Sequence, residues 1–190
     1  MRRSLLAALR SVSTLGLIGG LFALAVMPVQ AVTVAPLSFE ELVRQSSSVI
    51  YARVVDVRGQ WTDDRRGIDS LVTVAVIKGL KGTSAAELTV TVPGGQVGRY
   101  LNLLPGAPSF APGDLAVLFL TARGPRLPIT TGFTQGIYRV MRDGPSGTTL
   151  VTPPVIEPVG QAIVRGDRRR KPVSLTAFET AVRAVQNSPR

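Results

Sequence analysis

Apolar and polar residues alternate along several short stretches of the chain, a two-residue period that is typical of strands with one buried face. Leu88–Val92 is the clearest case, because its leucine and valines alternate with threonines. Leu115–Leu120 is apolar throughout, which predicts a buried central strand. The expected strands cover residues 49–58, 68–78, 88–92, 115–120, a short stretch near 129, 136–142 and 148–151.

The first two expected strands carry signs of a curved sheet. The alternation slips at Val54 and Val55, which predicts a β-bulge that bends the first strand. In the second strand Val72, Val74 and Val76 share one face, while apolar residues also occupy the other. Closure into a barrel turns one face inward and lets helices cover part of the other, so this pattern favours a barrel.

Two helices are expected, one before the first predicted strand in the sequence and one after the last. Ser38 and Glu41 have the spacing of a capping box, which predicts a helix from Phe39 to about Gln45. At the other end, Ser174 can serve as an N-cap. Apolar residues then recur at the spacing of one helix face up to about Asn187, at Leu175, Phe178, Val182 and Val185.

Residues 93–113 contain five glycines and four prolines, which argues against regular structure over most of this span. A loop of this length is usually either functional or packed down as a lid. Its apolar residues favour a lid: Tyr100, Leu101, Leu103, Leu104 and Phe110.

The order of these elements predicts a mainly β fold, because strands and helices do not alternate. We expect a small antiparallel barrel, closed or partly closed and OB-like, with a short N-terminal helix and a C-terminal amphipathic helix. A β-sandwich is the alternative. The barrel would span residues 32–152, a proline-rich basic linker 153–173, and the helix that packs on the barrel 174–187.

Residues 1–31 have the features of a cleaved export signal. Arg2, Arg3 and Arg10 precede an apolar stretch, and small residues lead to an expected cut after Ala31. The stretch contains three glycines and is too short to span a bilayer. We therefore expect an exported protein, periplasmic or extracellular, without a stable membrane span after cleavage. The paired arginines partly resemble a twin-arginine signal, although a general secretory signal is the preferred interpretation.

Charge and composition narrow the classes of function. The 190 residues carry a formal charge of +10, of which three arginines belong to the predicted signal. A basic run near the C-terminus carries a further net charge of +4, from Arg165, Arg168, Arg169, Arg170 and Lys171 against Asp167. The rest of the chain keeps only about +3, so nucleic acid is not an expected partner.

The chain has no cysteine and no histidine, which excludes disulfides, thiolate or imidazole metal sites, a cysteine nucleophile and a Ser-His-Asp triad. No catalytic residue, cofactor or metal site is therefore expected. An enzyme that uses carboxylates alone would need two of them in one cleft. The candidates are Asp56, Asp63, Asp64, Asp69 and Glu87, but the adjacent Asp63 and Asp64 are expected at an exposed hairpin tip.

Four segments together carry a resemblance to known proteins: residues 48–55, the Lys-Gly turn of 74–82, residues 88–95, and 110–114 with 118–120. Their succession resembles a group of exported, largely uncharacterised bacterial proteins and, more distantly, the OB barrel of netrins and tissue inhibitors of metalloproteinases. This resemblance implies a barrel. Those inhibitors present an N-terminal cysteine to a catalytic zinc, and this chain has none.

Three functions follow as hypotheses. The first is a non-enzymatic barrel that binds an extracytoplasmic protein or an envelope polymer through its loop face, with Trp61, Arg99, Tyr100 and Phe110 as candidate contacts. The second is a polyanion or membrane-surface binder that uses the basic run 165–171. The third is an inhibitor-like protein that lacks the zinc-chelating cysteine.

Overall fold

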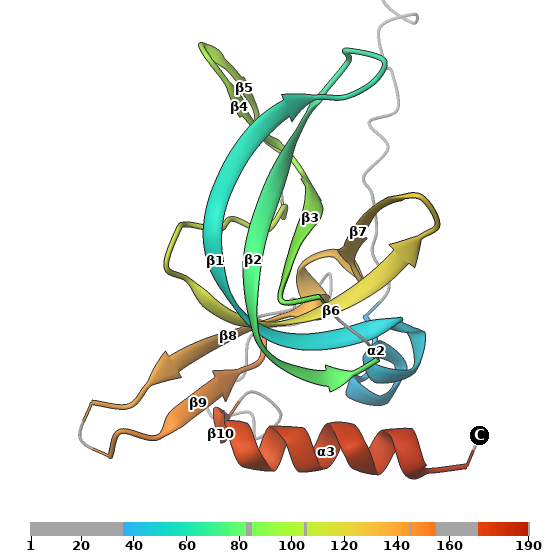
Figure 1. Cartoon of the computed structure of the whole chain (residues 1–190), viewed down its shortest axis with the longest axis vertical. Coiled ribbons are helices and arrows are strands. Elements are labelled where there is room, and N and C mark those ends of the chain that lie inside the picture. Colours follow the sequence, from blue (N-terminus) through green and yellow to red (C-terminus); the bar gives the residue numbers. More distant parts are fainter. Residues whose placement is uncertain (1–35, 83–84, 105, 145, 155–170, 190) are drawn as a thin grey trace, which may run out of the picture. The chain divides into compact units, whose positions relative to one another are not determined.

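Five strands close into a ring in the computed structural model, which describes residues 36–82, 85–104, 106–144, 146–154 and 171–189. They are β1 (Ser48–Trp61), β2 (Ile68–Lys81), β3 (Glu87–Pro93), β6 (Leu115–Arg123) and β7 (Arg126–Thr130). The order around the ring is β1-β2-β3-β7-β6, and β6 returns to β1 (Figure 1). The fold is thus the predicted mainly β, partly closed barrel rather than a sandwich.

The ring closes weakly at one seam. β3 and β7 run parallel, and within the described residues only Thr91 and Ile129 pair across them. The other neighbours in the ring pair antiparallel, as expected. The order, with one parallel pair, is that of a five-stranded Greek-key barrel that remains partly open.

The predicted bulge in β1 is confirmed. Val54 pairs with Val74, whereas Asp56 pairs with Thr73, so that Val55 is the extra residue on β1. Its side chain is exposed, because the bulge turns it out of phase with its neighbours. The bend lets β1 follow β2 along one edge and β6 along the other.

β6 is apolar on both faces because each face meets a different core. Ala116, Leu118 and Leu120 point into the ring, where they pack with valines and isoleucines of the other strands. Val117 and Phe119 point outward and are covered by two helices, α2 (Phe39–Gln45) and α3 (Leu175–Asn187). Both helices have the bounds that the sequence predicted.

An aromatic cluster fills the outer core between the helices and the barrel. Phe39, Phe119, Tyr138 and Phe178 come from four different elements, and their ring centroids lie 5.2–6.4 Å apart. Most pairs meet edge to face, the favoured geometry for aromatic rings. Burial in this cluster raises the pKa of Tyr138 to about 12.

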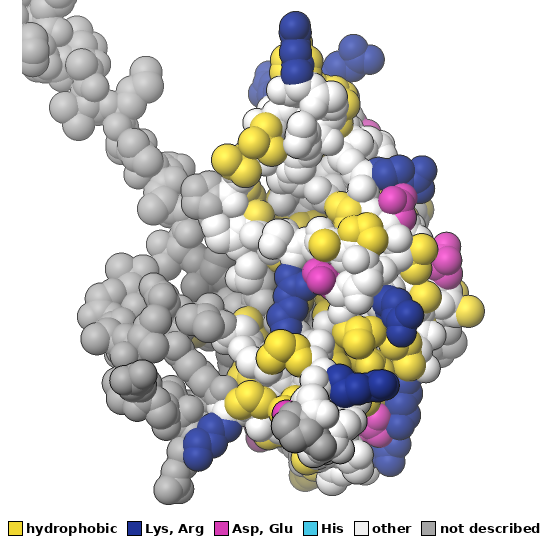
Figure 2. Space-filling view, turned by 90° about the vertical axis from the view of Figure 1, so that its left-hand side faces the viewer, with side chains coloured by type: hydrophobic (Ala, Val, Ile, Leu, Met, Phe, Trp, Pro, Cys, Tyr) yellow, Lys and Arg dark blue, Asp and Glu magenta, His cyan; other side chains and the backbone are white. Residues whose placement is uncertain are grey.

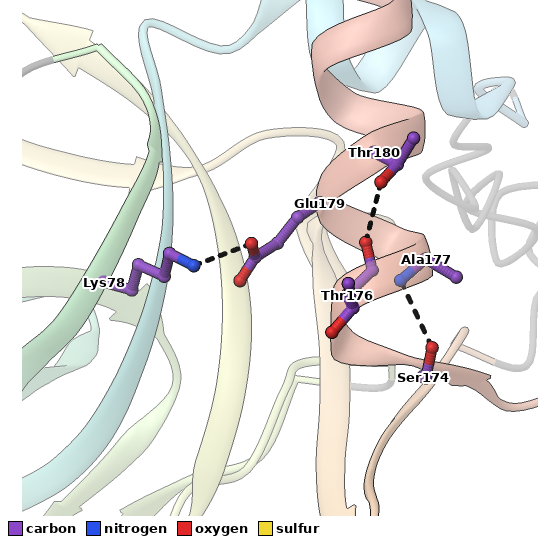
Figure 3. A network of polar contacts seen from close by, with 6 residues as sticks. All are labelled: Lys78, Ser174, Thr176, Ala177, Glu179 and Thr180. Carbon is purple, nitrogen blue, oxygen red and sulfur yellow. Dashed lines mark hydrogen bonds and ion pairs between the residues drawn. The ribbon is translucent and has the colours of Figure 1, made fainter.

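The helix ends follow the predicted caps. The Glu41 amide donates to Ser38 Oγ (3.2 Å), and the Ser38 amide donates to Glu41 Oε2 (2.7 Å). These bonds hold the pKa of the Glu41 carboxyl below its usual value. In α3, the Ala177 amide donates to Ser174 Oγ, and Lys78 of β2 pairs with Glu179 at 2.7 Å (Figure 3).

Shorter strands extend the sheet beyond the ring: β8 (Ile137–Arg142), β9 (Thr149–Thr152) and β10 (Val173–Ser174). The 3-10 helix η1 (Phe133–Gly136) connects β7 to β8. β8 pairs with β6, and β9 and β10 continue outward from β8.

The predicted loop 93–113 is more regular than expected. It contains a two-stranded hairpin, β4 (Gly95–Val97) and β5 (Tyr100–Asn102). The glycines that argued against strands instead permit this hairpin, because Gly98 takes a left-handed φ of +57° in its two-residue turn.

Candidate interaction face

Trp61 and Tyr100 form an exposed aromatic pair. Trp61 ends β1 and Tyr100 begins β5, and their ring centroids lie 5.5 Å apart in an edge-to-face arrangement. Trp61 is 38% exposed and Tyr100 is 51% exposed. Two of the predicted contact residues therefore meet on one surface, although they are far apart in the sequence.

A close backbone approach holds the β4–β5 hairpin against β1 and β2. A Cβ atom on Gly59 would lie only 1.9 Å from the carbonyl oxygen of Gln96. The Ser70 hydroxyl donates to the Gly94 carbonyl oxygen (2.7 Å), and the Gly94 amide donates to the carbonyl oxygen of Ile68 (3.0 Å). Because only glycine leaves room at position 59, this residue positions Tyr100 beside Trp61.

Arg99 joins the aromatic pair. Its guanidinium carbon lies 5.2 Å from the centroid of the Tyr100 ring, and Nη2 donates to the Tyr100 hydroxyl (3.2 Å). In the described part of the chain, the arginines that form ion pairs are Arg58 and Arg139. The guanidinium of Arg99 is thus held by an aromatic residue and stays exposed to solvent.

Phe110 is placed differently from the other three candidates. It is half-buried and packs against the core inside the ring. The guanidinium of Arg139 lies 5.1 Å from its ring centroid, donates to Asp114 (2.8 Å) and also donates to the Ser109 carbonyl oxygen. Phe110 therefore anchors the end of the long loop, apart from the Trp61–Tyr100 pair.

An open groove of about 230 Å³ lies between the hairpin, the loop and the barrel wall. Val57 and Val72 form the wall, and Leu101, Leu104 and Phe110 line the other sides. Leucines at the groove are exposed, with Leu103 at 78%. The expectation that these leucines pack down as a lid is wrong. Of the expected lid residues, Phe110 packs against the core, whereas Leu101, Leu103 and Leu104 are exposed to solvent.

The side of the molecule that carries the hairpin mixes apolar and basic side chains. Figure 2 shows the side of the molecule on which Figure 1 places the hairpin, with separate hydrophobic patches and Lys or Arg side chains between them. The exposed apolar residues that belong to this region are Trp61, Tyr100, Leu101, Leu103 and Leu104.

The carboxylates do not assemble into a cleft. Asp63 and Asp64 are exposed at the hairpin tip, where the Thr62 hydroxyl and the Arg66 amide donate to Asp64 and lower its pKa. Asp56 pairs with Arg58 at 2.7 Å. Among the described residues, no group of three or more potential metal ligands is present.

Most of the basic run lies outside the described residues, as do the predicted export signal and the greater part of the predicted linker. Of the run's basic residues, Lys171 is the one that the structure describes, and its side chain is exposed. Lys171 borders a second apolar pocket, of about 240 Å³, with Phe39, Tyr138 and Phe178. No helix in the described ranges has the length and apolar character needed to cross a membrane.

Comparisons with known proteins found no matching family model, curated protein or solved structure. The resemblance to netrin-type barrels thus stays a prediction. The candidate interaction face rests on the geometry of the chain itself.

Sequence reasoning missed two features of this face. The role of Gly59 had a usable signal, because a lone glycine inside a strand often marks a close backbone approach. The meeting of Trp61 with Tyr100 had no such signal, since it depends on where the β4–β5 hairpin folds back.

Proposed function

We propose that this chain is an exported, non-enzymatic β-barrel module that binds a partner protein through the face formed by Trp61, Arg99 and Tyr100. The observation that carries the proposal is the exposed contact between Trp61 and Tyr100, held in place by the backbone approach at Gly59. Export follows from the predicted signal at residues 1–31.

The composition of the face supports a protein partner. Tryptophan, tyrosine and arginine are the residue types that dominate the energy of protein interfaces, and here they touch one another. Exposed leucines, including Leu101 and Leu103, surround them. Clustered apolar side chains of this kind mark interaction sites, because burying them removes apolar surface from water.

The proposal is tested with one aromatic variant and one control variant in a cross-linking experiment on the envelope fraction. The wild-type protein and the variants Tyr100→Ala and Met141→Ala carry the same photo-cross-linker on the β4–β5 hairpin. Met141 is a matched control, because it is an exposed apolar residue on β8.

We expect one or more specific adducts with wild type and with Met141→Ala, and a loss of about tenfold with Tyr100→Ala, as is typical for a hot-spot residue. Circular dichroism would verify that each variant is folded. Equal adduct yields for all three proteins would contradict the proposal.

A further inference from the structure

The edge of β1 that faces away from β2, here called its outer edge, is paired along only half of its length. Over Ser48–Arg53 this edge pairs with β6. At Val54 it bonds to the turn that precedes β6, since the Gly113 amide donates to the Val54 carbonyl oxygen and the Val54 amide donates to that of Asp114, both at 2.8 Å. Beyond the bulge, no described strand pairs with this edge, although β4 packs across β1 at Gly59.

The register of β1 and β2 identifies the backbone groups that point outward. The Thr62 amide donates to the Gly67 carbonyl oxygen (3.0 Å), so Thr62 and Gly67 form a hydrogen-bonded pair. Hydrogen-bonded and non-hydrogen-bonded pairs alternate along an antiparallel ladder. Counting back from Thr62, the non-hydrogen-bonded pairs are Trp61–Ile68, Gly59–Ser70 and Val57–Val72.

A second bond supports this assignment. The Ile68 carbonyl oxygen accepts from the Gly94 amide, on the side of β2 away from β1. Trp61, opposite Ile68, must therefore also direct its N–H and C=O away from β2. The amides and carbonyls of Val57, Gly59 and Trp61 thus face the outer edge, and the described residues offer them no backbone partner.

We propose that an extended segment of the partner protein adds to β1 as a strand along Val57–Trp61. Its backbone would bond to the outward groups of Val57, Gly59 and Trp61, which is the β-augmentation mode of peptide recognition. This inference rests on the proposed function and names the form of the partner at that face.

The groove indicates which kind of side chain the added segment has opposite Val57. Residues opposite each other on neighbouring strands share one face of the sheet. A side chain opposite Val57 would therefore enter the groove that Val57 lines, where Leu104 and Phe110 provide apolar contacts. The side chain opposite Trp61 would meet the aromatic pair. We infer an apolar residue at the first of these positions.

A second copy of the chain fits this edge less well. Antiparallel pairing of two copies about Gly59 would bring Trp61 of one copy opposite Val57 of the other. That indole already packs on Tyr100 and is not free to enter the groove. Dimerisation through β1 is accordingly an outcome that would overturn the proposal.

The first test measures backbone amide exchange by NMR with the purified protein. A library of random linear peptides is displayed and selected for binding, and the selected peptides are added to the labelled protein. Without peptide, the amides of Val57, Gly59 and Trp61 should exchange quickly, whereas those of Arg58 and Gln60, which face β2, should be protected.

Bound peptide should slow exchange at Val57, Gly59 and Trp61 by about tenfold or more, and should leave Arg58 and Gln60 unchanged. Two further peptides carry N-methyl groups, one at every odd and the other at every even position. Only every second amide of an added strand faces β1, so one of the two peptides should lose binding and the other should keep it. A failure to select any peptide, or protection elsewhere, would overturn the proposal.

A pair of variants at one position separates the backbone from the side chain. Val57→Pro removes the outward amide but not the bonds to β2, while Val57→Ala keeps the amide and shortens the side chain. We expect Val57→Pro to weaken peptide binding about tenfold more than Val57→Ala does. Equal weakening by both would overturn the proposal.

The outcomes distinguish this inference from the proposed function. If Tyr100→Ala abolishes partner cross-linking while the three edge amides remain exposed to exchange in the complex, the face binds a protein but not by strand addition. If sedimentation shows a dimer that protects the same amides, a second copy occupies the edge.

Discussion

The ammonium nitrogen of Lys81 lies 2.6 Å from the carbonyl oxygen of Ser46, just past the end of α2. It also donates to the carbonyl oxygens of Val43 (2.5 Å) and Arg44 (3.3 Å). The last carbonyls of a helix lack partners within the helix and carry partial negative charge, so a cation at this point satisfies both needs. The end of β2 thereby fixes the first helix to the barrel.

Replacing Lys81 should therefore destabilise the fold. We expect Lys81→Met to lower the free energy of unfolding by about 1–3 kcal/mol, because hydrogen bonds from a charged donor are lost at half-buried carbonyls. Urea denaturation would measure the change. Arg58→Met is the control, since both side chains of the Arg58–Asp56 pair are exposed and the pair should contribute about 1 kcal/mol or less. A larger loss for Arg58→Met would contradict this ranking.

Gly59→Ala should displace the β4–β5 hairpin. The new Cβ atom cannot occupy its position without moving the Gln96 backbone, and Tyr100 moves with the hairpin. Trp61 is the single tryptophan of the chain, so its fluorescence reports directly on loss of the Tyr100 contact. Gly144→Ala is the matched control, because nothing lies within 4 Å of a Cβ atom there. An unchanged emission spectrum for Gly59→Ala would refute the positioning role of Gly59.

Asp69→Asn should stabilise the protein at neutral pH. Partial burial raises the pKa of Asp69 above its ordinary 3.8, although Arg123 opposes this shift. The folded state thus binds the Asp69 proton more tightly than the unfolded state does, and this contribution is lost as the pH rises from 3.8 through the raised pKa.

The asparagine variant has no such loss, so its melting temperature should exceed that of wild type at pH 7 and should approach it at a pH below 3.8, the ordinary pKa of Asp69. A wild type that is the more stable protein at pH 7 would contradict the assigned sign.

Tyr138→Phe should alter alkaline behaviour. Burial raises the pKa of Tyr138 to about 12, so the stability associated with its neutral form is present below pH 10 and is lost as the pH rises through 12. An ultraviolet titration of wild type should show a tyrosine that ionises near pH 12, and Tyr138→Phe should remove this late step. Survival of the late step in the variant would assign it to a different tyrosine.

The sequence was informative where a local rule determines the structure. The capping box at Ser38 and Glu41 marked the start of α2, and the slip at Val54 and Val55 located the bulge. Each of these signals depends on residues that are neighbours in the chain. The same holds for the apolar run of β6, which needs two buried faces whatever covers them.

Contacts between distant segments could not be predicted in this way. The glycines of 94–98 are compatible with an irregular loop and with a hairpin, and only the fit of Gln96 against Gly59 selects the hairpin. Likewise, Phe110 and Tyr100 are both aromatic residues of one loop. Their separation into an anchor and an exposed contact depends on Arg139 and Trp61, which belong to other strands.

The alternating side chains of β6 join the two cores of the molecule. Residues 116–120 are all buried, and successive side chains serve different cores. Neither the helical layer nor the ring can separate from this strand without exposing large apolar side chains, so we expect the two to unfold in a single transition. The side chains of the hairpin beside Trp61 belong to neither core. We therefore expect substitutions in the hairpin to lower the free energy of unfolding far less than a polar replacement between residues 116 and 120 does.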